Sequence, residues 1–221
     1  MEVLPLRLAE VTYPMYHPWH GRPGIVFGYA IRGSGRVVLV DTGLGPPPHP
    51  EIDPYYKPVR TDLASALIQH GSQPRDVSAI ICTHLHFDHC GGNPTFPGVP
   101  IFVQSAEKDA ARVEGYTIPE WIEFPGVRYE LRSGDFSLAD GIEVISTPGH
   151  TPGHQSVLVR EEAGPILIAG HAIGSALEWE RREPPSETSQ AATLSAERLR
   201  RLEPRKVYFS HDETTFESRF R

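Results

Sequence analysis

Short apolar runs separated by turn residues recur along the chain and predict a protein rich in β-strands. The runs 24–31 (GIVFGYAI) and 36–41 (RVVLVD) are rich in β-branched residues, and the turn sequence RGSG between them predicts a hairpin. By the same pattern, further strands are expected at residues 78–83, 101–104, 127–131, 136–147, 155–161, 165–170 and 206–211. The strands fall into two sets along the sequence.

Helical periodicity appears in three places, at residues 61–71, 105–115 and 189–202. In the first, Thr61 is a candidate N-cap, the apolar residues Leu63 and Leu67 share one face, and Gly71 ends the pattern. The proline-rich stretch 42–54 cannot continue a helix and predicts an irregular loop. Two sets of strands with helices between and after them pack most simply as a sandwich of two sheets with the helices outside.

Length and charge narrow the class of protein. A chain of 221 residues is enough for one sizeable domain, so we expect residues 1–221 to form a single domain. The net charge is −7 and no Lys/Arg block is present, which argues against a nucleic-acid partner. No apolar run approaches the length of a membrane span, and no secretory signal is visible. We therefore expect a cytoplasmic protein whose Cys82 and Cys90 are reduced thiols.

Ligand-type side chains are densest in CTHLHFDHCGG, residues 82–92, which contains His84, His86, Asp88 and His89. Imidazole and carboxylate groups are zinc ligands. On extended chain leaving a strand, the i, i+2 spacing of His84 and His86 points both rings to one face. The glycines at 91–92 are expected to let the chain turn closely past bound ions. The cluster therefore predicts a metal site at the end of a buried strand.

Three later histidines each follow an apolar run, namely His150, His171 and His211. Because these runs are predicted strands, we expect the three rings to converge with the first cluster on one rim of the sheets. His154 repeats the tetrapeptide around His150, and His150 is preferred as the ligand because it directly follows its strand. The remaining histidines are expected to be solvated, in loops or near a helix end: His17, His20, His49 and His70.

Four motifs give the chain a recognisable resemblance: VDTG (40–43), THLHFDHCGGN (83–93), TPGHTPGHQS (147–156) and FSHD (209–212). In order and spacing they resemble those of the metallo-β-lactamase-fold hydrolases, and most of all the N-acyl-homoserine lactone lactonase branch. The resemblance spans nearly the whole chain. It implies an α+β fold, an αββα four-layer sandwich in which two mixed β-sheets are flanked by helices.

The resemblance also implies a centre with two metal ions, zinc in the first instance and iron or manganese as alternatives. By position the ligands would be His84, His86 and His150 for the first ion, and Asp88, His89 and His211 for the second. Asp41 would orient a ligand histidine from behind. A metal-bound hydroxide would attack a carbonyl carbon, and Asp88 would carry the water proton to the leaving alkoxide.

Two positions depart from this family pattern. His171 stands where the family usually has an aspartate that bridges both ions, and an imidazole can bind only one of them. With Asp88 as the only charged ligand, the second ion is expected to bind more weakly than the first. Gly174 stands where the lactonases carry a tyrosine thought to assist the substrate, and Tyr16 or His17 could replace that tyrosine.

The sequence thus predicts a metal-dependent hydrolase that opens a lactone or a small ester of a small-molecule substrate. The alternatives are a glyoxalase II-like thioesterase, a mononuclear iron persulfide dioxygenase and, last, a relative that binds metal without catalysis. Trp19, Trp121 and Trp179 could form apolar walls for the substrate or serve ordinary packing. A homodimer is left open.

Overall fold

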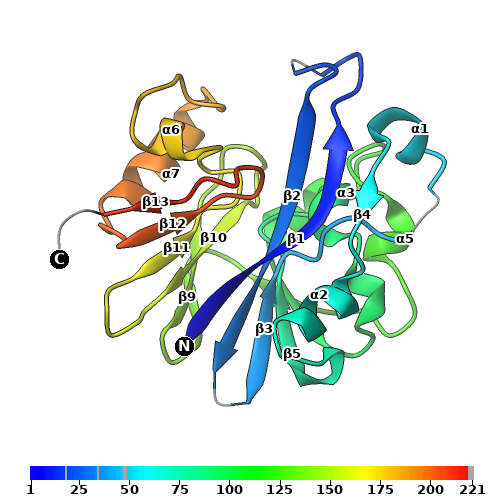
Figure 1. The fold of residues 1–221 in the computed structure, drawn as a ribbon, viewed down its shortest axis with the longest axis horizontal. Coiled ribbons are helices and arrows are strands. Elements are labelled where there is room, and N and C mark those ends of the chain that lie inside the picture. The colour runs from blue at the N-terminus through cyan, green and yellow to red at the C-terminus, as the bar shows by residue number, and fades with distance from the viewer. Residues whose placement is uncertain (18, 34, 47–48, 219–221) are drawn as a thin grey trace.

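The computed structural model describes residues 1–17, 19–33, 35–46 and 49–218, and its strands form two mixed sheets (Figure 1). The first sheet has the order β4-β1-β2-β3-β5-β6-β7. Its strands are β1 (Glu2–Thr12), β2 (Pro23–Gly33), β3 (Arg36–Val40), β4 (Val59–Arg60), β5 (Val77–Ile81), β6 (Pro100–Gln104) and β7 (Arg128–Arg132). The predicted hairpin turn at residue 34 and the predicted loop at residues 47 and 48 lie outside the described residues.

The second sheet has the order β13-β12-β11-β10-β9-β8. Its strands are β8 (Phe136–Ala139), β9 (Ile142–Ser146), β10 (Gln155–Val159), β11 (Ile166–Ile168), β12 (Lys206–Tyr208) and β13 (Phe216–Glu217). The run 136–147, predicted as one strand, is an antiparallel pair, because the chain turns at Gly141 with a φ of 77°. β1 was not predicted from the sequence; it pairs antiparallel with β2 across an irregularity between Arg7 and Ala9.

Helices lie on the outer side of each sheet (Figure 1). They are α1 (Asp53–Tyr56), α2 (Leu63–Gln69), α3 (Phe87–Cys90), α4 (Ser105–Ala110), α5 (Pro119–Ile122), α6 (Ala176–Trp179) and α7 (Gln190–Arg200). The predicted helix 61–71 is shorter, because Asp62 rather than Thr61 caps it by accepting a hydrogen bond from the Ser65 N–H. The predicted helix 105–115 ends at Ala110, whereas 189–202 corresponds closely to α7.

Three apolar layers hold these elements together. Between the sheets, residues such as Tyr29 and Ile81 of the first sheet pack against Val157 and Ile168 of the second. A second cluster joins α2 to the outer face of the first sheet, and a third joins α6 and α7 to the outer face of the second. Burial of apolar surface in these layers is the main favourable contribution to folding. The predicted four-layer αββα sandwich is therefore confirmed.

A buried amide ties the two sheets together beside the functional edge. The Gln155 side chain on β10 donates to the carbonyl of Cys82, directly after β5, at 2.8 Å and to that of Phe102, on β6, at 3.0 Å. Its oxygen accepts from Gln104 Nε2 at 2.8 Å. These bonds satisfy polar groups that would otherwise be buried without partners.

Strand direction decides where the functional side chains gather. β3 and β5 run parallel, as do β11 and β12, and β9 and β11 are both antiparallel to β10. β3 and β5 therefore deliver their carboxyl ends to one edge of the first sheet, and β9, β11 and β12 deliver theirs to one edge of the second. These two edges form one rim of the sandwich, where side chains that follow the strands meet. In the described residues, no helix has both the length and the hydrophobicity needed to cross a bilayer.

Candidate metal centre

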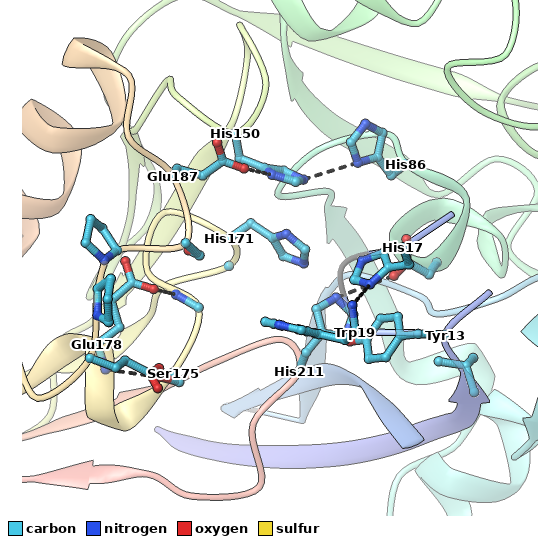
Figure 2. A pocket seen from close by; sticks show the side chains of 18 of the residues that line it. Tyr13, His17, Trp19, His86, His150, His171, Ser175, Glu178, Glu187 and His211 are labelled. Carbon is cyan, nitrogen blue, oxygen red and sulfur yellow. Dashed lines mark hydrogen bonds and ion pairs between the residues drawn. The ribbon is translucent and has the colours of Figure 1, made fainter. Parts of the chain in front are cut away.

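Histidines from both sheets meet at this rim (Figure 2). The strands end earlier than the sequence predicts, at Val40, Ile81 and Tyr208, so the side chains that follow them stand on irregular backbone. Potential ligand atoms lie within 4.8 Å of one another in three groups: His84, His86 and His150; Asp88, His89 and His211; and His84, His89 and His171. The structure thus brings together all the residues that the sequence proposes as metal ligands.

The first group joins a loop of the first sheet to a loop of the second. The ring centroid of His84 lies 4.6 Å from that of His86 and 4.9 Å from that of His150. His150 Nε2 is 3.2 Å from His86 Nδ1. Burial and the neighbouring His150 lower the pKa of His86 to about 4, so its ring is neutral at pH 7 and has a lone pair to offer.

The second group contains a carboxylate. Asp88 Oδ2 lies 3.4 Å from His211 Nε2 and 3.7 Å from His89 Nε2. Burial alone would raise the pKa of Asp88, but His89 and His211 outweigh it, so the pKa lies below its ordinary value. Asp88 and His89 lie on the short helix α3, which begins directly after His86, rather than on the loop that the sequence suggests.

His171 lies between these two groups. Its ring centroid is 4.2 Å from that of His150 and 4.5 Å from that of His211. Burial and neighbouring imidazoles hold the pKa of His171 well below its ordinary value. A neutral ring at this position adds a nitrogen donor but no negative charge.

Unpartnered nitrogen atoms test whether a metal fits. In the described part of the chain, Nε2 of His84, His89 and His171 is buried and has no hydrogen-bond partner. Leaving buried polar atoms unpaired costs free energy, on the order of 1–3 kcal/mol each. A coordinated cation removes that cost, and imidazoles with one carboxylate form a donor set that zinc accepts. The residues therefore fit a divalent metal.

Asp41 orients two of these rings by hydrogen bonds, that of His89 directly and that of His84 through Thr83. Its Oδ2 lies 2.7 Å from His89 Nδ1 and accepts from the Thr83 hydroxyl at 2.8 Å, while its Oδ1 accepts from the Thr83 N–H at 2.7 Å. The Thr83 hydroxyl in turn lies 3.0 Å from His84 Nδ1. With both Nδ1 atoms donating in this direction, the Nε2 atoms of His84 and His89 are left to bind an ion.

The backbone of Asp41 is itself strained, with a φ of 59° at the end of β3. Such a conformation costs a non-glycine residue about 1–3 kcal/mol. Its side chain is 2% exposed, and its hydrogen bonds to the end of β5 offset the strain. Asp41 therefore contacts the His89 ring directly and the end of β5 through Thr83.

Glu107, on α4, is a buried carboxylate that the sequence analysis missed. It accepts hydrogen bonds from the Leu85 N–H (2.8 Å), the Tyr116 hydroxyl (2.5 Å), the Thr151 hydroxyl (2.6 Å) and the Gly153 N–H (3.2 Å). Leu85 separates His84 from His86, and Thr151 follows His150. Glu107 therefore joins the two loops that carry the first group.

Two further contacts orient the rings of candidate ligands. Glu187 Oε1 lies 2.9 Å from His150 Nδ1, and the Ile25 carbonyl lies 2.5 Å from His211 Nδ1. With Nδ1 held in this way, Nε2 of His150 faces His86 and Nε2 of His211 faces Asp88. Nothing in the sequence distinguishes Glu107 or Glu187 from surface glutamates, because their partners come from distant segments.

The other histidines divide by environment. His154 is fully buried, with Nδ1 2.8 Å from the Thr147 hydroxyl and Nε2 accepting from the His171 N–H at 2.9 Å, so neither nitrogen is left for a metal. His20 is exposed and His70 half-buried. His17 and His49 are less solvated than predicted, since His17 stacks on Tyr13 and His49 contacts Trp121.

The paired glycines have a different role from the one predicted. Their φ values are ordinary, −62° for Gly91 and −83° for Gly92. A Cβ on Gly91 would lie 2.1 Å from the Gly45 nitrogen, and one on Gly92 would lie 2.4 Å from the Thr42 carbonyl oxygen. The glycines therefore let the loop after Asp41 pack directly against α3.

A cavity of about 650 Å³ opens onto the centre. Tyr13, Trp19, Tyr56 and Phe87 line it. Five of the candidate ligands line it as well: His86, Asp88, His150, His171 and His211. The other two tryptophans pack elsewhere, Trp121 against Ile118 and Trp179 among the residues of α6 and α7.

Gly174 also lines this cavity, and its N–H donates to Glu178 Oε2 at 2.8 Å. Of the two residues proposed to compensate for the absent tyrosine, His17 lines the cavity. Tyr16 is 70% exposed and donates a 3.4 Å hydrogen bond to the Tyr56 hydroxyl.

Known proteins resemble this chain along most of its length. An N-acyl homoserine lactonase from a Bacillus sp is 37% identical over 155 residues, which cover 68% of this chain and 62% of the relative. The match thus spans less than two thirds of that relative. The N-acyl homoserine lactonase AttM of Azorhizobium caulinodans is 29% identical over 229 residues, covering 92% of this chain and 82% of the relative.

A similar solved structure is that of a mutant of AiiA from B. thuringiensis with N-decanoyl-L-homoserine bound at the active site. It has a TM-score of 0.80 and 26% sequence identity, covering 96% of this chain and 93% of that one. A family model described as the metallo-beta-lactamase superfamily matches residues 21–211. The chain belongs to the metallo-β-lactamase superfamily and, within it, is similar to the N-acyl homoserine lactonases.

Proposed function

We propose that this protein is a two-zinc hydrolase that opens the ring of a small lactone. The observation that carries the proposal is the pair of ligand groups, His84, His86 and His150 beside Asp88, His89 and His211, at the floor of a partly aromatic cavity. Similarity to N-acyl homoserine lactonases favours a lactone over other carbonyl substrates. Zinc suits the imidazole-rich donor set.

When bound in such a site, divalent zinc lowers the pKa of water to about 7 and polarises a carbonyl oxygen. The side chains of the protein determine where this chemistry happens. Asp41 and Glu187 hold Nδ1 of His89 and His150, so that their Nε2 atoms face the centre. Glu107 keeps the two loops of the first group at a fixed separation.

Asp88 is suited to move the proton. Because its pKa is lowered, the carboxylate is ionised at neutral pH and can accept the proton of the attacking water. The water oxygen bonds to the carbonyl carbon, the ring C–O bond breaks, and the proton passes to the departing alkoxide. The products are an alcohol and a carboxylic acid within one molecule, and the acid then releases one proton to solvent.

The cavity suits a substrate with an apolar substituent. Tyr13, Trp19, Tyr56 and Phe87 present aromatic surface near Asp88 and His211. Aromatic side chains supply large apolar contact area at a small cost in conformational entropy. N-decanoyl-L-homoserine, which an AiiA mutant binds at its active site, has a long apolar chain of this kind.

Lactone hydrolysis should be detectable as proton release. We expect turnover of γ- or δ-lactones in a pH-indicator assay, because ring opening leaves a carboxylic acid that ionises at neutral pH. Aryl esters, thioesters and a persulfide with oxygen monitoring serve as comparisons, and His84→Ala should abolish turnover. Strong thioester hydrolysis without lactone hydrolysis, or oxygen uptake with the persulfide, would refute the proposal.

Glu107→Gln should weaken binding of the first metal by about 10–100-fold, the usual effect of losing a partner that orients a ligand. A glutamine side chain has one acceptor oxygen and one NH2 donor. Its NH2 group must therefore face donors, either the Leu85 N–H or the Thr151 hydroxyl and the Gly153 N–H. Competition with a zinc chelator measures the effect. Glu123→Gln, a mostly exposed glutamate that pairs with Lys108, is the matched control. An unchanged zinc affinity in Glu107→Gln would show that this carboxylate only stabilises the fold.

His171→Asp should raise the affinity for the second metal by roughly 10–100-fold, because it adds a negative charge between two dications. His171→Asn introduces a side chain of nearly the same shape as aspartate but without the negative charge, and it should not raise the affinity for the second metal. Stepwise removal of zinc by a chelator separates the two ions. Simultaneous loss of both ions from the parent protein, unchanged in His171→Asp, would show that residue 171 does not control the second site.

A further inference from the structure

One carboxylate in the wall of the cavity has no role in orienting a histidine. Glu178, on α6, is 4% exposed and lines the cavity near Gly174. In the described residues, one hydrogen bond reaches its carboxylate, from the Gly174 N–H to Oε2 at 2.8 Å. A carboxylate can accept about four hydrogen bonds, so most of its acceptor capacity is unused.

The backbone around Glu178 holds this carboxylate in place. The Ser175 hydroxyl caps α6 by accepting the Glu178 N–H at 3.0 Å, and Arg200 Nη2 donates to the Glu178 carbonyl at 2.8 Å. Gly174 gives it room, because a Cβ there would lie 3.1 Å from Glu178 Oε2. The negative charge is therefore preorganised at the wall of the cavity.

Apart from the proposed zinc ions, which the imidazoles and Asp88 would hold, nothing in the described lining of the cavity supplies a cation to match this charge. Among the described residues that line it there is no lysine or arginine. The other two glutamates in the wall have partners, since Glu187 contacts His150 and Glu183 accepts from the Ser175 hydroxyl. A buried carboxylate is costly without a compensating partner, and a ligand can be that partner.

Aromatic side chains lie across the cavity from Glu178. Figure 2 shows Tyr13 and Trp19 on the side opposite Glu178 and Ser175, with His171 between the two sides. An ammonium group placed between a carboxylate and an aromatic ring is stabilised both by ion pairing and by the cation–π interaction. A neutral alkyl group of the same shape gains neither.

We propose that Glu178 makes the enzyme selective for lactones that carry a cationic ammonium substituent. This inference rests on the proposed lactone hydrolysis and adds the chemical class of the substrate. The lactone carbonyl faces the metal ligands, and the ammonium group lies toward Glu178. Charge at position 178, rather than cavity shape, then determines the preference.

Two isosteric substrates test the proposal. One is a γ-butyrolactone with a 2-(trimethylammonio)ethyl substituent, and the other carries the uncharged 3,3-dimethylbutyl group. We expect kcat/KM to favour the cationic lactone by about tenfold or more, the scale of a desolvated quaternary ammonium group held against an aromatic ring. Glu178→Gln should bring the ratio close to one, and Glu180→Gln, an exposed glutamate on the same segment, should leave it unchanged.

The wild-type protein provides a test that does not depend on folding of the variant. Its preference should shrink as sodium chloride is raised, because salt screens charges in a cavity open to solvent. Equal kcat/KM values in the wild type, or a preference that survives in Glu178→Gln, would overturn the inference while leaving lactone hydrolysis in place. If none of the three lactones is hydrolysed, unsubstituted γ-butyrolactone included, the proposed function and this inference are overturned together.

Discussion

The carboxylate of Asp41 joins the end of β3, the end of β5 and the ring of His89 in one hydrogen-bonded unit. The arrangement of the whole centre depends on this unit. It requires a left-handed backbone at Asp41 and glycines at 91 and 92, so that the loop after β3 can lie directly on α3. Through Thr83 the unit extends to His84. Glu107 holds the loop that carries His150 in a similar way, by accepting a hydrogen bond from Thr151.

Neutral rings at His84 and His171 are a consequence of this arrangement. Burial keeps the pKa of His84 and of His171 well below the ordinary value, so neither ring gains charge at neutral pH. Their Nε2 atoms, with that of His89, lack partners in the described part of the protein. The apoprotein therefore carries a free-energy cost that metal binding can remove, which couples metal content to stability. With Asp88 as the one anionic group among the proposed ligands, electrostatics should make the two proposed ions unequal in affinity.

Sequence alone predicted the fold class and the residues that meet at the rim, because both depend on local signals. The His-x-His-x-Asp-His spacing lies within one strand end and one helical turn, and the later histidines each follow an apolar run. What it missed depends on tertiary contacts. Glu107 and Glu187 find their partners far along the chain, and β1 mixes charged residues and Pro5 with its apolar positions. The packing role of Gly91 could not be predicted, because its neighbour is the distant Gly45.

Location of the ions is the most direct test of a two-zinc centre. Anomalous diffraction at the zinc absorption edge, from crystals of protein saturated with zinc, gives the position and occupancy of each ion. We expect two peaks, one among His84, His86 and His150 and a less occupied one among Asp88, His89 and His211. A single peak among His84, His89 and His171, the third group of ligand atoms within 4.8 Å of one another, would contradict it.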